Sequence, residues 1–227
     1  MLELIDVKKS YPVYGRQTGQ RVLEGINLKV QAGQRIVIAG PSGCGKSTLL
    51  NLIGGLDKAD SGQVLFEGCD LGKASDAEIS RIRNARIGFV FQMHHLLPQL
   101  TVMENVLLPT IAGSKREDKT DKATELLDRV GLKQWCRHRP GQLSGGQRQR
   151  AAVVRAMINE PVLLLADEPT GALDKEASEN IAELLVELNE KDGVGLIVVT
   201  HSTELADRIG NVMRLDNGIL SSGETAE

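Results

Sequence analysis

The sequence lacks the features of membrane-spanning and secreted proteins. Its longest apolar run, around Val162 to Ala166, is far shorter than the roughly 20 residues needed to span a bilayer. The N-terminus carries the acidic residues Glu3 and Asp6, where a signal peptide would have a basic start followed by an apolar stretch. We therefore expect a cytoplasmic protein.

Cysteine is scarce and scattered. The chain has three cysteines, Cys44, Cys69 and Cys136, and none belongs to a CxxC pair. An odd, dispersed set predicts neither a disulfide framework nor a structural zinc site. Cys44 is expected to be a small residue in a tight turn. The alternative, a redox switch, would require a thiol with a depressed pKa.

Strong charge is also missing. The formal net charge is −3 over 227 residues, and no basic stripe indicates a nucleic-acid partner. The composition, 41% hydrophobic and 25% charged, is typical of an ordinary soluble domain. We found no internal repeat and no low-complexity tract. The length suits one sizeable core, with or without a subdomain.

A phosphate-binding loop follows the buried-strand pattern at Ile36 to Ile38. It fits G-x-x-x-x-G-K-S and precedes the apolar face of a predicted helix. Its glycines allow backbone N–H groups to turn toward a phosphate. Lys46 is placed to reach the β- and γ-phosphates, and Ser47 to offer its hydroxyl to Mg²⁺. The segment comprises Gly40, Pro41, Ser42, Gly43, Cys44, Gly45, Lys46, Ser47 and Thr48.

Two acids come directly after the buried run at 162–166. Ligands bind at the carboxyl edge of parallel sheets, so Asp167 and Glu168 are placed near the phosphate-binding loop. Asp167 is expected to hold the Mg²⁺ shell, and Glu168 to be the general base for the water that attacks the γ-phosphate.

The chain alternates strand and helix patterns. Short strands are expected between residues 2 and 39, at 63–66, 87–91, 162–166 and 196–199, with an acidic, lysine-bearing linker between the second and third of these regions. Helical spacing predominates from Met93 to about Met157 and returns at 181–188. This alternation predicts an α/β fold with a parallel sheet and an inserted helical subdomain.

A second glycine-rich segment lies about a hundred residues after the phosphate-binding loop. It consists of Leu143, Ser144, Gly145, Gly146 and Gln147. Ser144 can cap a helix, and the two glycines let a phosphate approach the backbone closely.

This LSGGQ segment, in order with the phosphate-binding loop, resembles the signature of the ATP-binding cassette (ABC) family. The resemblance covers nearly the whole chain. It implies a P-loop NTPase (RecA-like) core with an N-terminal antiparallel β subdomain and an inserted α-helical subdomain. Residues 1–227 would form one nucleotide-binding domain, with the core at about 1–92 and 158–220 and the helical subdomain at about 93–157.

The resemblance also implies roles for residues that are weak signals alone. His201 matches the switch histidine that contacts the γ-phosphate, and Gln92 matches the glutamine that senses Mg²⁺. Asp174 matches the aspartate at the dimer seam. Tyr11 matches the aromatic residue that stacks on adenine, with Tyr14 as a rival.

In this family the signature of one subunit closes over ATP held by another, so a homodimer binding two ATP is implied. The segment from Met93 to Val106 resembles the lipoprotein-release and macrolide-export ATPases. That resemblance implies a separate membrane permease that contacts the region after Gln92, and a location at the inner face of the membrane. The adjacent His94 and His95 cannot share one face of a helix or strand, which argues against a metal site there.

Two other readings stay open. A division-type cassette would signal to a cell-wall hydrolase instead of exporting a cargo. A soluble, non-transport ABC ATPase would carry a long coiled coil between the two motifs, and the sequence has no sustained heptad there.

Overall fold

A parallel sheet forms the centre of the molecule. The computed structural model describes residues 1–12, 19–112 and 118–222. Within these residues, five strands of the central sheet run parallel and a sixth, β10, pairs antiparallel with β9. In spatial order the strands are β10 (Ile219–Ser222), β9 (Val212–Asp216), β3 (Arg35–Ala39), β8 (Gly195–Thr200), β7 (Leu163–Asp167) and β6 (Ile87–Phe91).

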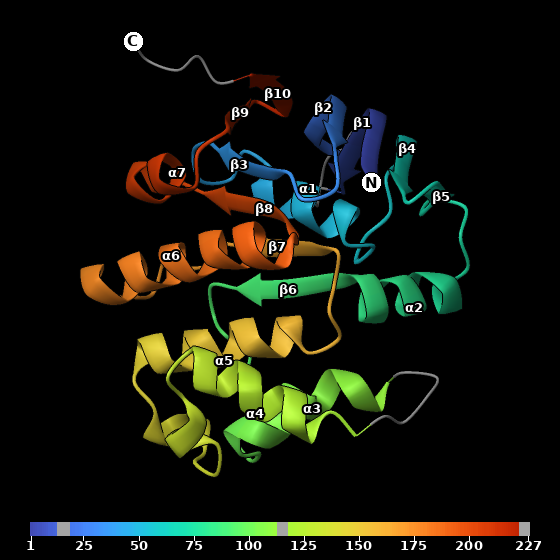
Figure 1. The fold of residues 1–227 in the computed structure, drawn as a ribbon. Coiled ribbons are helices and arrows are strands. Elements are labelled where there is room, and N and C mark those ends of the chain that lie inside the picture. The colour runs from blue at the N-terminus through green and yellow to red at the C-terminus, as the bar shows by residue number, and fades with distance from the viewer. Residues whose placement is uncertain (13–18, 113–117, 223–227) are drawn as a thin grey trace.

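A second sheet, wholly antiparallel, lies at the N-terminal end of the chain (Figure 1). Its strands, in spatial order, are β2 (Gln20–Val30), β1 (Leu2–Tyr11), β4 (Ser61–Phe66) and β5 (Cys69–Asp70). The first two are longer than the short strands that the sequence predicts, because β1 and β2 pair along almost their whole length.

Alternate residues of the parallel strands enter two different cores. On β7, Leu164 and Ala166 face one apolar cluster, whereas Leu163 and Leu165 face the other. A sheet buried on both faces requires apolar side chains at successive positions. This explains why the strand patterns at 162–166 and 196–199 are continuous apolar runs.

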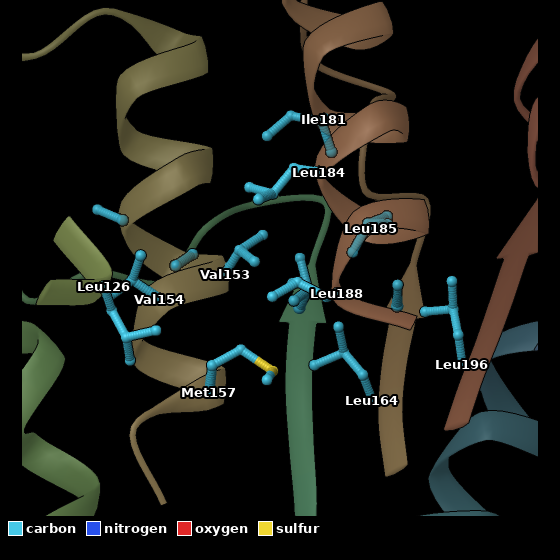
Figure 2. Close-up of a cluster of buried hydrophobic side chains, with 14 of the residues drawn as sticks. Leu126, Val153, Val154, Met157, Leu164, Ile181, Leu184, Leu185, Leu188 and Leu196 are labelled. Carbon is cyan, nitrogen blue, oxygen red and sulfur yellow. The ribbon is translucent and has the colours of Figure 1, made fainter. Parts of the chain in front are cut away.

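Helices cover the two faces. Figure 1 shows α5 and α6 beside the parallel strands, with α3 and α4 beyond α5. Figure 2 shows Val153 and Met157 of α5 facing Leu164 of β7 and Leu184 and Leu188 of α6. The helices are α1 (Lys46–Ile53), α2 (Asp76–Arg86), α3 (Val102–Ile111), α4 (Thr120–Arg129), α5 (Gly145–Met157), α6 (Lys175–Asp192) and α7 (Thr203–Ile209), with short 3₁₀ turns at Lys133–Trp135 and Pro140–Gln142.

The prediction of a linker between the strands at 63–66 and 87–91 is wrong in part, because this segment contains helix α2. Ser75 and Glu78 form a capping box: the serine hydroxyl accepts from the Glu78 N–H, and the glutamate accepts from the Ser75 N–H. Only Ile79 of this helix is buried. A helix with one buried side chain has almost no apolar periodicity, but its capping box was readable.

The predicted α/β fold with a parallel sheet is confirmed, and a separate antiparallel sheet accompanies it. None of the helices in the described part of the chain is long and apolar enough to cross a membrane.

The contact between β6 and α5 depends on a glycine. A Cβ on Gly88 would stand 2.6 Å from the Ala156 carbonyl oxygen and 2.8 Å from Leu164 Cδ1. We therefore expect Gly88→Ala to lower the free energy of unfolding by about 1–3 kcal/mol, as overpacked cores do. Urea denaturation measures this change. Gly141→Ala is the control, since its Cβ would meet nothing within 4 Å. Equal midpoints for both variants would contradict the predicted clash.

Candidate active site

Three neighbouring strands end together and gather the polar residues that the sequence analysis singled out. Ala39, the last residue of β3, is level with Thr200 on β8, and Asp167 of β7 is level with Val199. The phosphate-binding loop, Glu168 and His201 each follow one of these strand ends. The site is therefore built at one edge of the parallel sheet.

The phosphate-binding loop leads into α1. Gly45 has φ 105 at the helix start, and a Cβ there would lie 2.9 Å from the Val22 carbonyl oxygen, so both conformation and space require glycine. The Lys46 Nζ lies across the loop, donating to the Gly40 carbonyl at 2.8 Å and the Pro41 carbonyl at 2.9 Å. A helix N-terminus beside a buried lysine is suited to bind phosphate.

A pair of oxygens lies at the mouth of this loop. The Ser47 hydroxyl donates to Asp167 Oδ1 at 3.1 Å. Burial raises the pKa of the Asp167 carboxyl, as does the nearby Glu168, while the Ser47 hydrogen bond and Lys46 oppose the rise. Hydroxyl and carboxylate oxygens are hard ligands of the kind that Mg²⁺ takes in nucleotide sites. Ser47 and Asp167, two of the residues predicted to hold Mg²⁺, are thus adjacent.

Three residues, Thr200, His201 and Lys46, surround the Glu168 carboxylate. Its Oε2 accepts from the Thr200 hydroxyl at 2.9 Å and from the His201 N–H at 3.3 Å. Its Oε1 lies 2.8 Å from His201 Nδ1 and 4.0 Å from Lys46 Nζ. The backbone of Glu168 has φ 45, a left-handed conformation uncommon outside glycine. The carboxylate thus has a defined orientation beside the lysine and histidine.

Gln92 follows the end of β6 and packs against Gly171. A Cβ on Gly171 would be 2.8 Å from Gln92 Nε2. Gly171 follows Glu168 by three residues, and its N–H donates to the Glu168 carbonyl at 3.0 Å. The expected sensor glutamine therefore lies beside the turn that carries the expected base.

The signature segment occupies a different place. Ser144 caps α5 by accepting from the Gln147 N–H at 3.2 Å, as its side chain predicts. A Cβ on Gly145 would lie 3.4 Å from Leu173 Cδ2, and a Cβ on Gly146 would lie 3.0 Å from Ala177 Cβ. Asp174 caps α6, and its Oδ1 accepts from the Ala177 N–H at 2.8 Å. In the described part of the chain, no hydrogen bond joins the signature to the phosphate-binding loop.

Tyr11, the last residue of β1, is 38% exposed. Its hydroxyl donates to Asp57 Oδ2 at 2.7 Å, and Lys9 Nζ lies 5.1 Å from the ring centroid. Burial and this Asp57 bond raise the pKa of Tyr11. Its rival Tyr14 lies outside the described residues.

Cys44 packs inside the turn of the phosphate-binding loop. Its Sγ would lie 2.9 Å from a Cβ placed on Gly40, which agrees with the expectation of a small residue that fills a tight turn.

Two site residues escaped the sequence analysis. Thr200 is fully buried and holds Glu168, and its place immediately before His201 was the available signal. Gln149, 1% exposed, donates to the Phe91 carbonyl at 2.9 Å, next to Gln92. No spacing rule pairs residues 58 positions apart.

Comparison with known proteins decides the family. The model of the ABC transporter family matches residues 23–171, well over half of the chain. The chain belongs to the ABC transporter family. It is therefore an ATP-binding ATPase, and the expected ABC resemblance is confirmed.

Curated members of the ABC family are similar over nearly the full length. The lipoprotein-releasing system ATP-binding protein LolD of Geobacter metallireducens is 48% identical over 96% of each chain. LolD of Idiomarina loihiensis is 46% identical over 97% of this chain and 96% of its own. An uncharacterized ABC transporter ATP-binding protein of Thermotoga maritima is 46% identical over 96% of this chain and 92% of its own.

Solved ABC cassettes share the fold. A dimeric, post-hydrolysis structure of the ATP-binding cassette MJ0796 with ADP and Pi has a TM-score of 0.87 and 40% identity, covering 97% of this chain and 96% of that one. CbiO1 of Clostridium perfringens, part of the cbiONQ transporter complex, has a TM-score of 0.84 and 29% identity, covering 97% and 88%.

The Thr200 hydrogen bond supplies a test of the ABC site. Thr200→Val keeps the side-chain shape but removes a donor to the Glu168 carboxylate. We expect kcat for ATP hydrolysis to fall by about tenfold, since a hydrogen bond to a charged group is lost, with little change in ATP affinity. Steady-state kinetics measures both constants, and Thr200→Ser, which keeps the hydroxyl, is the control. A serine variant as slow as the valine variant would contradict this role.

Proposed function

We propose that the chain is the ATP-hydrolysing subunit of a lipoprotein-release or macrolide-export type transporter, and that it drives a separate membrane permease. The observation that carries hydrolysis is the position of the Glu168 carboxylate, 2.8 Å from His201 Nδ1 and 4.0 Å from Lys46 Nζ, at the mouth of the phosphate-binding loop. Residues about 1–92 and 158–220 are taken as the ATP-binding core, and 93–157 as the helical subdomain.

Each residue at the sheet edge has a role in this reaction. Backbone N–H groups of the phosphate-binding loop bind the β-phosphate, and Lys46 binds the β- and γ-phosphates. Glu168 accepts a proton from the attacking water. The water oxygen bonds to the γ-phosphorus as the bond between that phosphorus and the ADP oxygen breaks. His201 contacts the γ-phosphate and orients that water.

The metal of the site is Mg²⁺. Ser47 and Asp167, joined at 3.1 Å, would hold it together with Gln92, which follows Phe91, the residue of β6 level with Asp167. When bound, Mg²⁺ neutralises charge on the phosphate oxygens during transfer. The fit is chemical: a hydroxyl, a carboxylate and an amide oxygen form the hard-oxygen set that Mg²⁺ takes.

A complete site needs two copies of the chain. The signature glycines lie against Leu173 and Ala177 of their own chain, away from their own phosphate-binding loop. A C₂ pair places each signature over the other subunit's ATP and brings Asp174 to the seam. MJ0796, 40% identical and with a TM-score of 0.87, is described as a dimer. ATP binding would thus close the pair, and hydrolysis would open it.

Glu168→Gln tests both hydrolysis and closure. The amide cannot accept the proton, so we expect the Mg²⁺-dependent ATPase rate to fall at least about a hundredfold. ATP stays bound, so light scattering should show a dimer with ATP and a monomer without nucleotide. The wild-type chain, which should turn over and not accumulate as a dimer, is the control. Normal hydrolysis by a monomeric Glu168→Gln variant would show that Glu168 is not the base.

Adenine recognition by Tyr11 has its own pair of variants. Tyr11→Ala removes a stacking surface that contributes about 1–3 kcal/mol, so ATP should bind roughly fivefold to a hundredfold more weakly. Tyr11→Phe loses only the hydroxyl bond to Asp57 and should bind nearly as well as wild type. Titration with a fluorescent ATP analogue measures both affinities. Equal weakening in the two variants would assign the effect to the Asp57 contact instead of stacking.

The permease is proposed to contact the region after Gln92. There Met93 is 62% exposed and Leu97 is 39% exposed. A groove of about 390 Å³ adjoins this region, with Phe89, Phe91 and Pro109 among its lining residues. The LolD relatives, at 46–48% identity, are named as parts of lipoprotein-releasing systems. The cassette would then work at the inner face of the cell membrane.

Co-purification tests the partner. Tagged cassette should retain a membrane permease from detergent-solubilised membranes, and Met93→Asp should weaken that retention without altering ATPase activity. Mass spectrometry of the retained proteins distinguishes a transporter from the division-type alternative, which would bring a cell-wall hydrolase with its membrane subunit. Unchanged retention by Met93→Asp would place the contact elsewhere.

A further inference from the structure

Helix α5 joins the signature to the segment that follows Gln92. The helix begins at Gly145, directly after Ser144. Near its other end, Arg155 donates from Nη1 to the His95 carbonyl at 2.6 Å and from Nη2 to the His94 carbonyl at 2.8 Å. One guanidinium thus holds two successive backbone carbonyls, a geometry that its planar fork suits.

The reaction described above does not use Arg155, yet its placement is costly. Burial lowers the pKa of the Arg155 guanidinium. Within the described residues Arg155 forms no ion pair, and its guanidinium donates instead to these two carbonyls. A partly buried cation requires strong hydrogen bonds in compensation, and bonds from a charged donor are stronger than neutral ones.

The segment that Arg155 holds is constrained from a second side. His95 has φ 48, a left-handed conformation that a non-glycine residue keeps only when its surroundings hold it. From α3, the fully buried Asn105 accepts from the Leu97 N–H at 2.7 Å and donates to the Leu97 carbonyl at 3.1 Å. Residues 94–97 are therefore fixed to helices of the inserted subdomain.

We propose that Arg155 is a positioning residue that makes residues 94–97 and α5 move as one body. A shift of Gln92 at the ATP site of one subunit then moves Ser144 and the signature glycines, which serve the other subunit's ATP. Arg155 also lines the groove beside β6, so a permease segment bound there acts on the same body. This inference rests on the dimeric ATPase proposed above.

Removal of the Arg155 hydrogen bonds to His94 and His95 should weaken closure of the ATP-bound dimer more than it weakens nucleotide binding. Arg155→Met keeps much of the apolar stem but has no donor. Combined with Glu168→Gln, it should raise the protein concentration needed for the ATP-bound dimer by roughly tenfold, because charge-assisted hydrogen bonds are lost. ADP affinity, which reports the phosphate-binding loop of the monomer, should stay within about twofold of the parent. Light scattering and ADP titration are the measurements.

A conservative variant and a matched control separate positioning from stability. Arg155→Lys keeps the charge and one point donor, so its dimerisation should fall between those of the parent and Arg155→Met. Arg129→Met is the control: Arg129 also lies in the helical insertion and pairs with Asp192 at 2.8 Å and Glu187 at 3.2 Å. It should leave dimerisation unchanged.

The outcomes are distinct. If Arg155→Met dimerised as well as the parent, the proposed positioning role of Arg155 would be wrong. The same would follow if Arg129→Met weakened dimerisation as much as Arg155→Met does. A parallel loss of ADP affinity in Arg155→Met and Arg155→Lys would also overturn this role, since the arginine would then support the whole fold. Failure of the Glu168→Gln parent itself to dimerise with ATP would refute the proposed dimer, and this inference with it.

Discussion

The register of three parallel strands is the constraint on which the site depends. Ala39 is level with Thr200, and Asp167 is level with Val199. Glu168 directly follows β7, His201 directly follows β8, and Lys46 begins α1 after the loop that leaves β3. With the strand ends aligned, Glu168 Oε1 lies 2.8 Å from His201 Nδ1 and 4.0 Å from Lys46 Nζ. Side-chain direction reverses with each residue of a strand, so a one-residue slip would turn the acids away from the loop.

That register is stabilised by burial on both faces of the sheet. Each parallel strand contributes alternate side chains to two cores, as Leu164 and Leu165 do on β7. A slipped strand would exchange its two faces and disturb both cores at once. The same packing supports the polar groups at the edge: Thr200, the last residue of β8, is fully buried and holds the Glu168 carboxylate at 2.9 Å.

The phosphate-binding loop and the signature segment lie in different parts of the fold. The first is the loop between β3 and α1, which belongs to the sheet. The second begins α5 and lies against Leu173 and Ala177. Three hydrogen bonds, one from Gln149 and two from Arg155, join α5 to the end of β6 and the residues after it. These hydrogen bonds connect α5 directly to the residues on both sides of Gln92, which is the basis for the proposed coupling between them.

Much of this was readable in the sequence for local reasons. Strands buried on both faces are continuous apolar runs, and a loop that binds phosphate needs glycines at set spacings, so the fold class and the main motifs could be predicted. Helix α2 could not be read from periodicity, because Ile79 is its only buried residue, and α7, β9 and β10 were not anticipated either. The Ser144 cap was predicted because a capping bond joins residues three positions apart.

The sequence by itself determined which chemical groups are present, in what order, and on which kinds of element. Only the tertiary structure decided which of them meet. The bonds from Thr200 to Glu168, Gln149 to Phe91, and Arg155 to His94 join residues separated by 32, 58 and 61 positions. Local propensity carries no information about such pairs, because their geometry is set by the order and register of strands and by the helices packed on them.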